Sequence, residues 1–163
     1  MALSLQDGRI VWAKVDQFLA NLNASPVVQA QFRGLKENVV GALKNPQLQF
    51  ISFDDADLVQ ATGVSPIGGV TSTVYGVYFI KNGTGVGNTT AMWLTLNNAT
   101  TNTVLATKLV LLHTAIAAQE MTALYPKGKI FATDLTLTAE NASLDGTEVA
   151  SGAAGTGFVI VGA

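Results

Sequence analysis

A chain of 163 residues is long enough to form one domain with a hydrophobic core and too short for two. Its residues are 48% hydrophobic and only 12% charged, which is about half the charged share of an average soluble domain. The net charge of −2 excludes a broad basic field for nucleic acid, and the absence of cysteine excludes disulfides and thiolate metal sites. The longest apolar run, LVLLHTAIAA, is shorter than the roughly 20 residues that a membrane-spanning helix needs.

The charged residues are unevenly distributed along the chain. Between Asp57 and Lys108 the only charged residue is Lys81, and no charged residue follows Glu148. A soluble domain normally keeps charges on its exposed faces, so this distribution favours surfaces that are covered by other protein. The alternative is a neutral surface that is solvated by hydroxyl and amide groups. The first residues lack a basic segment followed by an apolar one, so we expect no secretory signal and synthesis in the cytosol.

Residues 1–47 are predicted to form a helical N-terminal segment with two helices. Asp7 is a candidate cap of the first helix, and Ser25-Pro26 has the residue types that start a second one. Apolar residues recur at helical spacing in both helices, and the Lys-Asn-Pro sequence at 44–46 ends the second. The recurring positions are Val11, Val15, Phe18 and Leu22 in the first helix and Val28, Phe32, Leu35 and Val39 in the second.

The second predicted helix also carries small residues on another strip of its surface. Ala30, Gly34 and Gly41 lie at the positions concerned. Glycine in a helix interior costs about 1 kcal/mol relative to alanine. The strip therefore indicates either the close approach of another backbone or a simple tolerance of glycine, and the sequence leaves both open.

Residues 48–163 are predicted to form a β-sandwich domain. The fold class is therefore α+β, with an N-terminal helical hairpin followed by a mainly antiparallel β-sandwich or jelly-roll-like domain in one structural unit. Short runs rich in β-branched and aromatic residues are separated by Gly, Asn, Thr and Asp clusters. These runs are QFISF, VYGVYFI, AMWLTL, KIFATDLTLT and GFVIVGA. In KIFATDLTLT, Phe131, Leu135 and Leu137 alternate with polar residues, which predicts one strand buried on one face.

The segment 103–126 fits both helix and strand. Its leucines have helical spacing, whereas many of its other residues are β-branched. The sequence Tyr-Pro-Lys-Gly at 125–128 is typical of a turn that leads into the strand after it. We predict a strand to about Ala115 and then a loop.

The stretch NGTGVGNTT at residues 82–90 has three glycines on alternate positions after a predicted strand. A dinucleotide-binding loop needs the pattern G-x-G-x-x-G and a helix after it, whereas position 88 is Asn and a strand-like run follows. Asn82-Gly83 is a strong signal for a hairpin turn, so we predict a hairpin tip. The N-x-Ser/Thr sequons in the chain are explained by its Asn/Thr-rich composition, since we expect no secretory signal.

No group of residues predicts catalysis or metal binding. His113 is the only histidine and lies in an apolar run without a G-x-S-x-G motif nearby, which favours a structural or interface role. The acidic residues show neither a Ca²⁺-loop pattern nor a marked glycosidase pair, although the latter remains open. The acidic residues considered are Asp54, Asp55, Asp57, Glu120, Glu140 and Glu148. We therefore expect no enzyme activity, no catalytic residue, no metal, no cofactor and no small-molecule substrate.

A strand-turn-strand pattern in the second part of the chain resembles the small structural proteins of tailed-bacteriophage virions. It is similar to the β-sandwich or jelly-roll decoration (cement) proteins and to related head or tail proteins. The resembling stretches are VYGVYFIKNGTG, TAMWLTLNNATTN, ALYPKGKIFATDLTLTAENAS and the terminal GTGFVIVGA. The helical first part matches no pattern of that group.

The resemblance implies a mechanical function. Decoration proteins form homo-oligomers, often trimers, and bind across joints between major capsid proteins, so the implied location is the virion, on the capsid surface or in the head or tail. The net charge and the short apolar runs predict no nucleic-acid partner and no membrane partner. Because aromatic side chains dominate interface energetics, the candidate interface anchors are Trp12, Tyr75, Tyr78 and Trp93, and each is also a candidate core residue. The alternative is a carbohydrate-binding or receptor-binding β-sandwich module of a phage tail or fibre, with Trp93 or the tyrosines as exposed stacking platforms.

Overall fold

The computed structural model describes residues 6–42, 47–54, 58, 72–81, 92–98, 108–114, 120–141 and 155–162. These residues form two helices and two antiparallel sheets, so the predicted α+β class is confirmed. The helices are α1 (Gly8–Asn21) and α2 (Pro26–Ala42). The strands are β1 (Gln6–Asp7), β2 (Gln47–Phe53), β3 (Ser72–Lys81), β4 (Met92–Asn97), β5 (Lys108–Thr114), β6 (Glu120–Phe131), β7 (Thr136–Asn141) and β8 (Gly155–Gly162).

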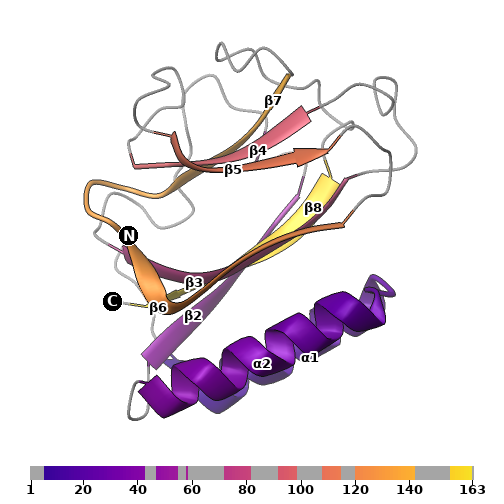
Figure 1. Ribbon diagram of the computed structural model, residues 1–163, viewed down its shortest axis with the longest axis vertical. Coiled ribbons are helices and arrows are strands. Elements are labelled where there is room, and N and C mark those ends of the chain that lie inside the picture. Colours follow the sequence, from indigo (N-terminus) through magenta and orange to yellow (C-terminus); the bar gives the residue numbers. More distant parts are fainter. Residues whose placement is uncertain are drawn as a thin grey trace.

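The described elements are arranged in three layers. The large sheet has five strands in the order β1-β2-β8-β3-β6, and the small sheet has three in the order β5-β4-β7. Figure 1 shows both helices along one face of the large sheet and the small sheet on its other side. The large sheet is therefore the middle layer, and both of its faces are covered.

The middle layer separates two hydrophobic cores. On β3, Val77 and Phe79 belong to the core between the two sheets, whereas Tyr78 belongs to the core between the large sheet and the helices. On β8, Val159 and Phe158 divide in the same way. Successive side chains of a strand point to opposite faces, so a strand covered on both faces needs apolar residues at every position. This requirement explains the uninterrupted apolar runs VYGVYFI and GFVIVGA.

Both helices begin where the sequence predicts. Ser25 precedes α2, and its Oγ accepts a hydrogen bond from the backbone N–H of Val28 at 3.3 Å. The buried face of α2 consists of the predicted residues Val28, Phe32, Leu35 and Val39. In α1 the buried face is rotated slightly from the prediction, since Trp12 and Leu19 are buried beside Val11 and Val15 while Phe18 and Leu22 are half-buried.

The prediction of one strand for KIFATDLTLT is wrong. Lys129, Ile130 and Phe131 end β6 in the large sheet, and the chain then crosses to β7 in the small sheet. Side chains bind backbone N–H groups at the crossing: Asn98 Oδ1 accepts from Thr133 at 2.8 Å, and Asp134 Oδ1 accepts from Leu135 at 2.8 Å. Phe131, Leu135 and Leu137 all reach the core between the sheets, so an alternating pattern persists across a change of sheet.

The expected turn at Tyr-Pro-Lys-Gly lies inside β6. The pairing of β3 with β6 passes from Gly76↔Leu124 to Val74↔Lys129, so several residues of β6 bulge out opposite Tyr75. Gly128 has φ of 79° within this bulge. The positive φ is a conformation that glycine adopts without strain, and here it lets β6 rejoin its partner.

Two further predictions concern the connections. The strand prediction near Ala115 is confirmed for residues 108–114, which form β5. The hairpin prediction for NGTGVGNTT is wrong, because β3 pairs with β6 and β8, while β4 pairs with β5 and β7. The strands on either side of the stretch belong to different sheets, so it connects the two sheets. Residues 82–90 themselves lie outside the described part of the chain.

Two glycines provide a matched test of the layered packing. A Cβ at Gly157 of β8 would clash with the backbone oxygen of Tyr78 and lie 2.8 Å from Cζ of Phe53, whereas a Cβ at Gly34 of α2 would meet no atom within 4 Å. We expect Gly157→Ala to lower the free energy of unfolding by about 1–3 kcal/mol through overpacking. Gly34→Ala should raise it by about 1 kcal/mol through helix propensity. Urea unfolding followed by circular dichroism measures both, and an unchanged midpoint for Gly157→Ala would contradict the tight strand packing.

Candidate functional site

Three of the four aromatic residues predicted as interface anchors are buried within the protein. Trp12, Tyr75 and Tyr78 are 2%, 6% and 0% exposed and belong to the core between the helices and the large sheet. Trp93 is half-buried on β4 in the small sheet. Of the four, only Trp93 is less than fully buried.

The carboxylate of Glu120 joins three elements that are far apart in sequence. It lies at the start of β6, and its Oε1 accepts hydrogen bonds from the backbone N–H of Ser25 at 2.9 Å and from the hydroxyl of Tyr78 at 3.2 Å. Its Oε2 accepts from Ser25 Oγ at 2.7 Å. We call this arrangement of Ser25, Tyr78 and Glu120 the Glu120 clamp.

The Glu120 clamp has a clear electrostatic basis. Ser25 immediately precedes α2, where unpaired N–H groups and the helix dipole favour a negative charge. Burial raises the pKa of the Tyr78 hydroxyl, and the neighbouring Glu120 carboxylate raises it further. Tyr78 therefore stays a neutral donor to Glu120. The protein itself occupies both carboxylate oxygens, which gives Glu120 a structural role.

The outer face of the small sheet carries a buried polar network. Leu94 and Leu96 of β4 belong to the core between the sheets, so the residues between and beside them lie on the opposite face. There, the hydroxyl oxygens of Thr95 and Thr138 are 2.6 Å apart. Asn97 Nδ2 donates to Thr138 Oγ1 and to the backbone oxygen of Thr136, each at 3.3 Å. We call the surface formed by Trp93, Thr95, Asn97, Thr136 and Thr138 the outer polar face.

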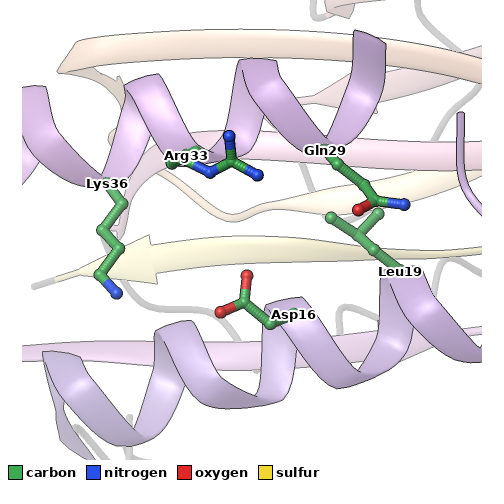
Figure 2. A pocket seen from close by; sticks show the side chains of 5 residues that line it. All are labelled: Asp16, Leu19, Gln29, Arg33 and Lys36. Carbon is green, nitrogen blue, oxygen red and sulfur yellow. The ribbon is translucent and has the colours of Figure 1, made fainter. Parts of the chain in front are cut away.

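A groove runs between the two helices on the solvent side. It has a volume of about 350 Å³, and Figure 2 shows Asp16 and Leu19 of α1 facing it from one side. Gln29, Arg33 and Lys36 of α2 line the other side. All but Leu19 are exposed side chains. The groove therefore presents side chains of both charges, and Gln29 Nε2 donates a hydrogen bond to the backbone oxygen of Ala24 at 2.9 Å.

The burial of Lys81 makes the uneven charge distribution of the sequence more pronounced. It is the only charged residue between Asp57 and Lys108, and it is only 2% exposed at the end of β3. Removal from water lowers the pKa of its ammonium group. Residues 58–107 thus bring essentially no charge to the surface of the protein.

The remaining sequence candidates lie partly outside the described residues. Within the described ranges, no three His, Asp or Glu residues are placed to hold a metal ion. Asp54 is exposed, and Asp55, Asp57 and Glu148 lie outside the described residues. In those same ranges, neither helix has the length and hydropathy to cross a membrane.

Comparisons with known proteins found no matching family model, no matching curated protein and no matching solved structure.

The Glu120 clamp generates a prediction for stability. We expect Glu120→Gln to lower the free energy of unfolding by about 1–3 kcal/mol, because the amide replaces one charged acceptor with a donor that faces the N–H or O–H of Ser25. The control is Glu37→Gln, which removes an exposed carboxylate from α2. Denaturant unfolding measures both changes, and equal midpoints for the two variants would show that the clamp contributes nothing.

The raised pKa of Tyr78 generates a prediction for pH. In the unfolded chain tyrosine ionises near pH 10, whereas in the folded protein Tyr78 keeps its proton to higher pH. The folded state therefore binds more protons in this range, so its stability is complete below about pH 10 and falls as the pH rises further. Tyr78→Phe removes this contribution and should flatten the fall. Thermal unfolding at pH 8 to 11.5 tests the difference, and parallel curves for the two proteins would refute it.

Proposed function

We propose that this protein is a non-enzymatic structural subunit of a virion. It acts as a capsid decoration (cement) protein with a jelly-roll β-sandwich, associates with itself as an oligomer such as a trimer, and stabilises contacts between major capsid proteins. Its location is the capsid surface or the head or tail structure, after synthesis in the host cytoplasm. The observation that carries the proposal is the burial of Lys81, which leaves residues 58–107 without an exposed charge.

The charge argument rests on the composition of protein interfaces. Charged residues are depleted in the cores of interfaces, and permanent assemblies have the most apolar ones. A monomer in water gains solubility from charges on all sides. A long stretch without exposed charges therefore suits a surface that another chain covers. The exposed charges of the described residues lie instead largely on the helix layer, where Lys14, Arg33 and Lys36 are examples. This contrast between the helix layer and the stretch 58–107 supports the proposal that another chain covers part of the protein.

The strand pairing supports the jelly-roll part of the proposal. A jelly roll is a long antiparallel ribbon rolled into two sheets, so its strand pairs are nested within one another in sequence. Here β2 pairs with β8, β3 with β6, and β4 with β5, which is a nested set. Rolling the ribbon into two sheets also brings together strands that are not partners in the nested set. The pairs β3–β8 and β4–β7 are of this kind.

Native mass measured over a range of concentrations tests the oligomer. We expect a defined multiple of the chain mass that persists on dilution, by light scattering and by native mass spectrometry. A monomer at every concentration would refute the proposal of a self-associating subunit.

Charge insertion tests where the chains meet. We expect the double substitution Thr84→Asp and Thr89→Asp to weaken self-association, because it puts two charges into the uncharged stretch 58–107. The matched control adds charges to the helix layer at exposed Gln17 and Gln31. Sedimentation velocity measures the dissociation constants, and equal effects of the two double variants would contradict a contact through the uncharged stretch.

A further inference from the structure

Strand β6 forms one edge of the large sheet (Figure 1). Among the described residues it pairs only with β3, so in this part of the chain no strand lies along its outer side. The N–H and C=O groups on the outer side of an edge strand can bind an extended chain, which then becomes a further strand of the sheet. β6 has twelve residues, whereas β1 at the opposite edge has two. The edge at β6 therefore offers much the longer row of backbone groups.

The two halves of β6 differ in the features that normally protect a sheet edge. Proline, lysine and β-bulges all hinder pairing with another chain. The second half has all three, because Pro126 and Lys127 are exposed within the bulge and Lys129 follows it. The first half has none of them: Met121–Leu124 contains no proline and no charged residue, and it pairs with β3 in regular register. We call Met121–Leu124 the open edge.

Positive charge lies at the C-terminal end of the open edge. Tyr125 directly follows it, and Lys129 Nζ is 5.8 Å from the centroid of the Tyr125 ring. Lys127 is exposed at the same end of the strand. A strand that pairs antiparallel with β6 begins where the open edge ends, so its first residues come close to these cations. Charge complementarity therefore favours a strand that has an acidic residue on its N-terminal side.

The position of α2 decides between a second copy of this chain and another protein. Helix α2 lies over β6, since Ser25 binds Glu120 and Gln31 Oε1 accepts a hydrogen bond from Thr122 Oγ1 at 3.1 Å. Paired strands are about 4.8 Å apart, so pairing two β6 strands would bring their α2 helices to a similar separation. Packed helices need about 8–10 Å. The β6 strand of a second copy is therefore too crowded, whereas a strand without a helix over it fits.

We propose that the open edge binds an extended segment of another protein as an additional antiparallel strand. The segment is uncharged along the open edge and has an acidic residue on its N-terminal side. Its backbone groups exchange hydrogen bonds with those of the open edge, and its acidic residue lies near Lys129. This contact does not require self-association, so it is separate from the proposed oligomer.

A short peptide probes the open edge of the complete protein. The probe is acetyl-Glu-Thr-Val-Thr-Val-Thr-amide, and NMR of the ¹⁵N-labelled protein measures its binding. We expect saturable shifts at millimolar peptide in the backbone amide signals of Met121–Leu124. A control peptide with proline at its central threonine should not bind, because proline lacks a backbone donor. A second control with lysine in place of glutamate should bind about threefold more weakly or worse, because its charge repels Lys129.

Three protein variants locate the contact. Thr122→Lys places on the open edge the residue that protects natural edges, and it should weaken binding of the probe about tenfold or more. Lys129→Gln should remove the difference between the glutamate and lysine peptides, which covers the case in which Thr122→Lys unfolds. The matched control is Ile130→Lys, which adds the same charge at an exposed position beyond the bulge and should bind the probe at least as well as the wild type.

Three results would overturn the proposal. The first is the absence of saturable shifts at Met121–Leu124. The second is undiminished binding of the proline peptide, or of the probe to a folded Thr122→Lys, with folding established by far-ultraviolet circular dichroism. The third is weaker self-association of Thr122→Lys by native mass, because the occupant would then be a second copy. A wild-type monomer that binds the probe would refute the proposed oligomer and support the strand site, so the two failures are distinguishable.

Discussion

Strands β3 and β8 run through the middle of the large sheet and are covered on both faces, and the other elements are placed by the need to provide those two covers. On one side the cover is the pair α1 and α2, and on the other it is the small sheet (Figure 1). Burying both faces requires apolar side chains at successive positions, and it leaves little room for charge near these strands. The low charge content of the chain is partly a consequence of this architecture. Lys81 is affected by the same burial, which lowers the pKa of its ammonium group.

The helix cover is fixed to the sheet by polar and aromatic contacts together. Phe158 of β8 is at the centre of an aromatic cluster with Phe18, Phe32, Phe50 and Tyr78, with ring centroids 5.0 to 5.6 Å from its own. Apolar contacts of this kind do not by themselves set the position of a helix along a sheet. The Glu120 clamp does, since its hydrogen bonds have defined geometry at the first turn of α2. The aromatic cluster thus supplies apolar contacts, and the clamp supplies the directional hydrogen bonds that fix the register.

The two outer sides of this arrangement have different chemistry. The helix layer carries exposed charges and a mixed-charge groove, which suit contact with water. The outer polar face of the small sheet has a buried hydroxyl and amide network instead. The proposed capsid role depends on the uncharged stretch 58–107.

Local patterns could be predicted from the sequence because they depend on neighbouring residues. The start of α2 at Ser25-Pro26, the buried positions of α2 and the strand at 108–114 are of this kind. The interface anchors could not be predicted from composition, because an aromatic ring is equally suited to a core and to an interface. Trp12 and Tyr78 are in the core, and only their burial shows it. Glu120 is one of the acidic residues among which the sequence marks no pair but leaves a glycosidase pair open, and its partner Ser25 is 95 residues away.

By itself, then, the sequence determined the α+β class, the two helices and the apolar runs, since helix caps and side-chain periodicity act over a few residues. Tertiary structure alone decided which strands pair. KIFATDLTLT reads as one strand because its alternation continues, yet it passes from one sheet to the other at residues 132–135. NGTGVGNTT reads as a hairpin tip, yet the strands beside it have their partners elsewhere. Strand pairing depends on the burial of whole sheet faces. The residues that form one face are far apart in the sequence, so no local pattern of residues predicts the pairing.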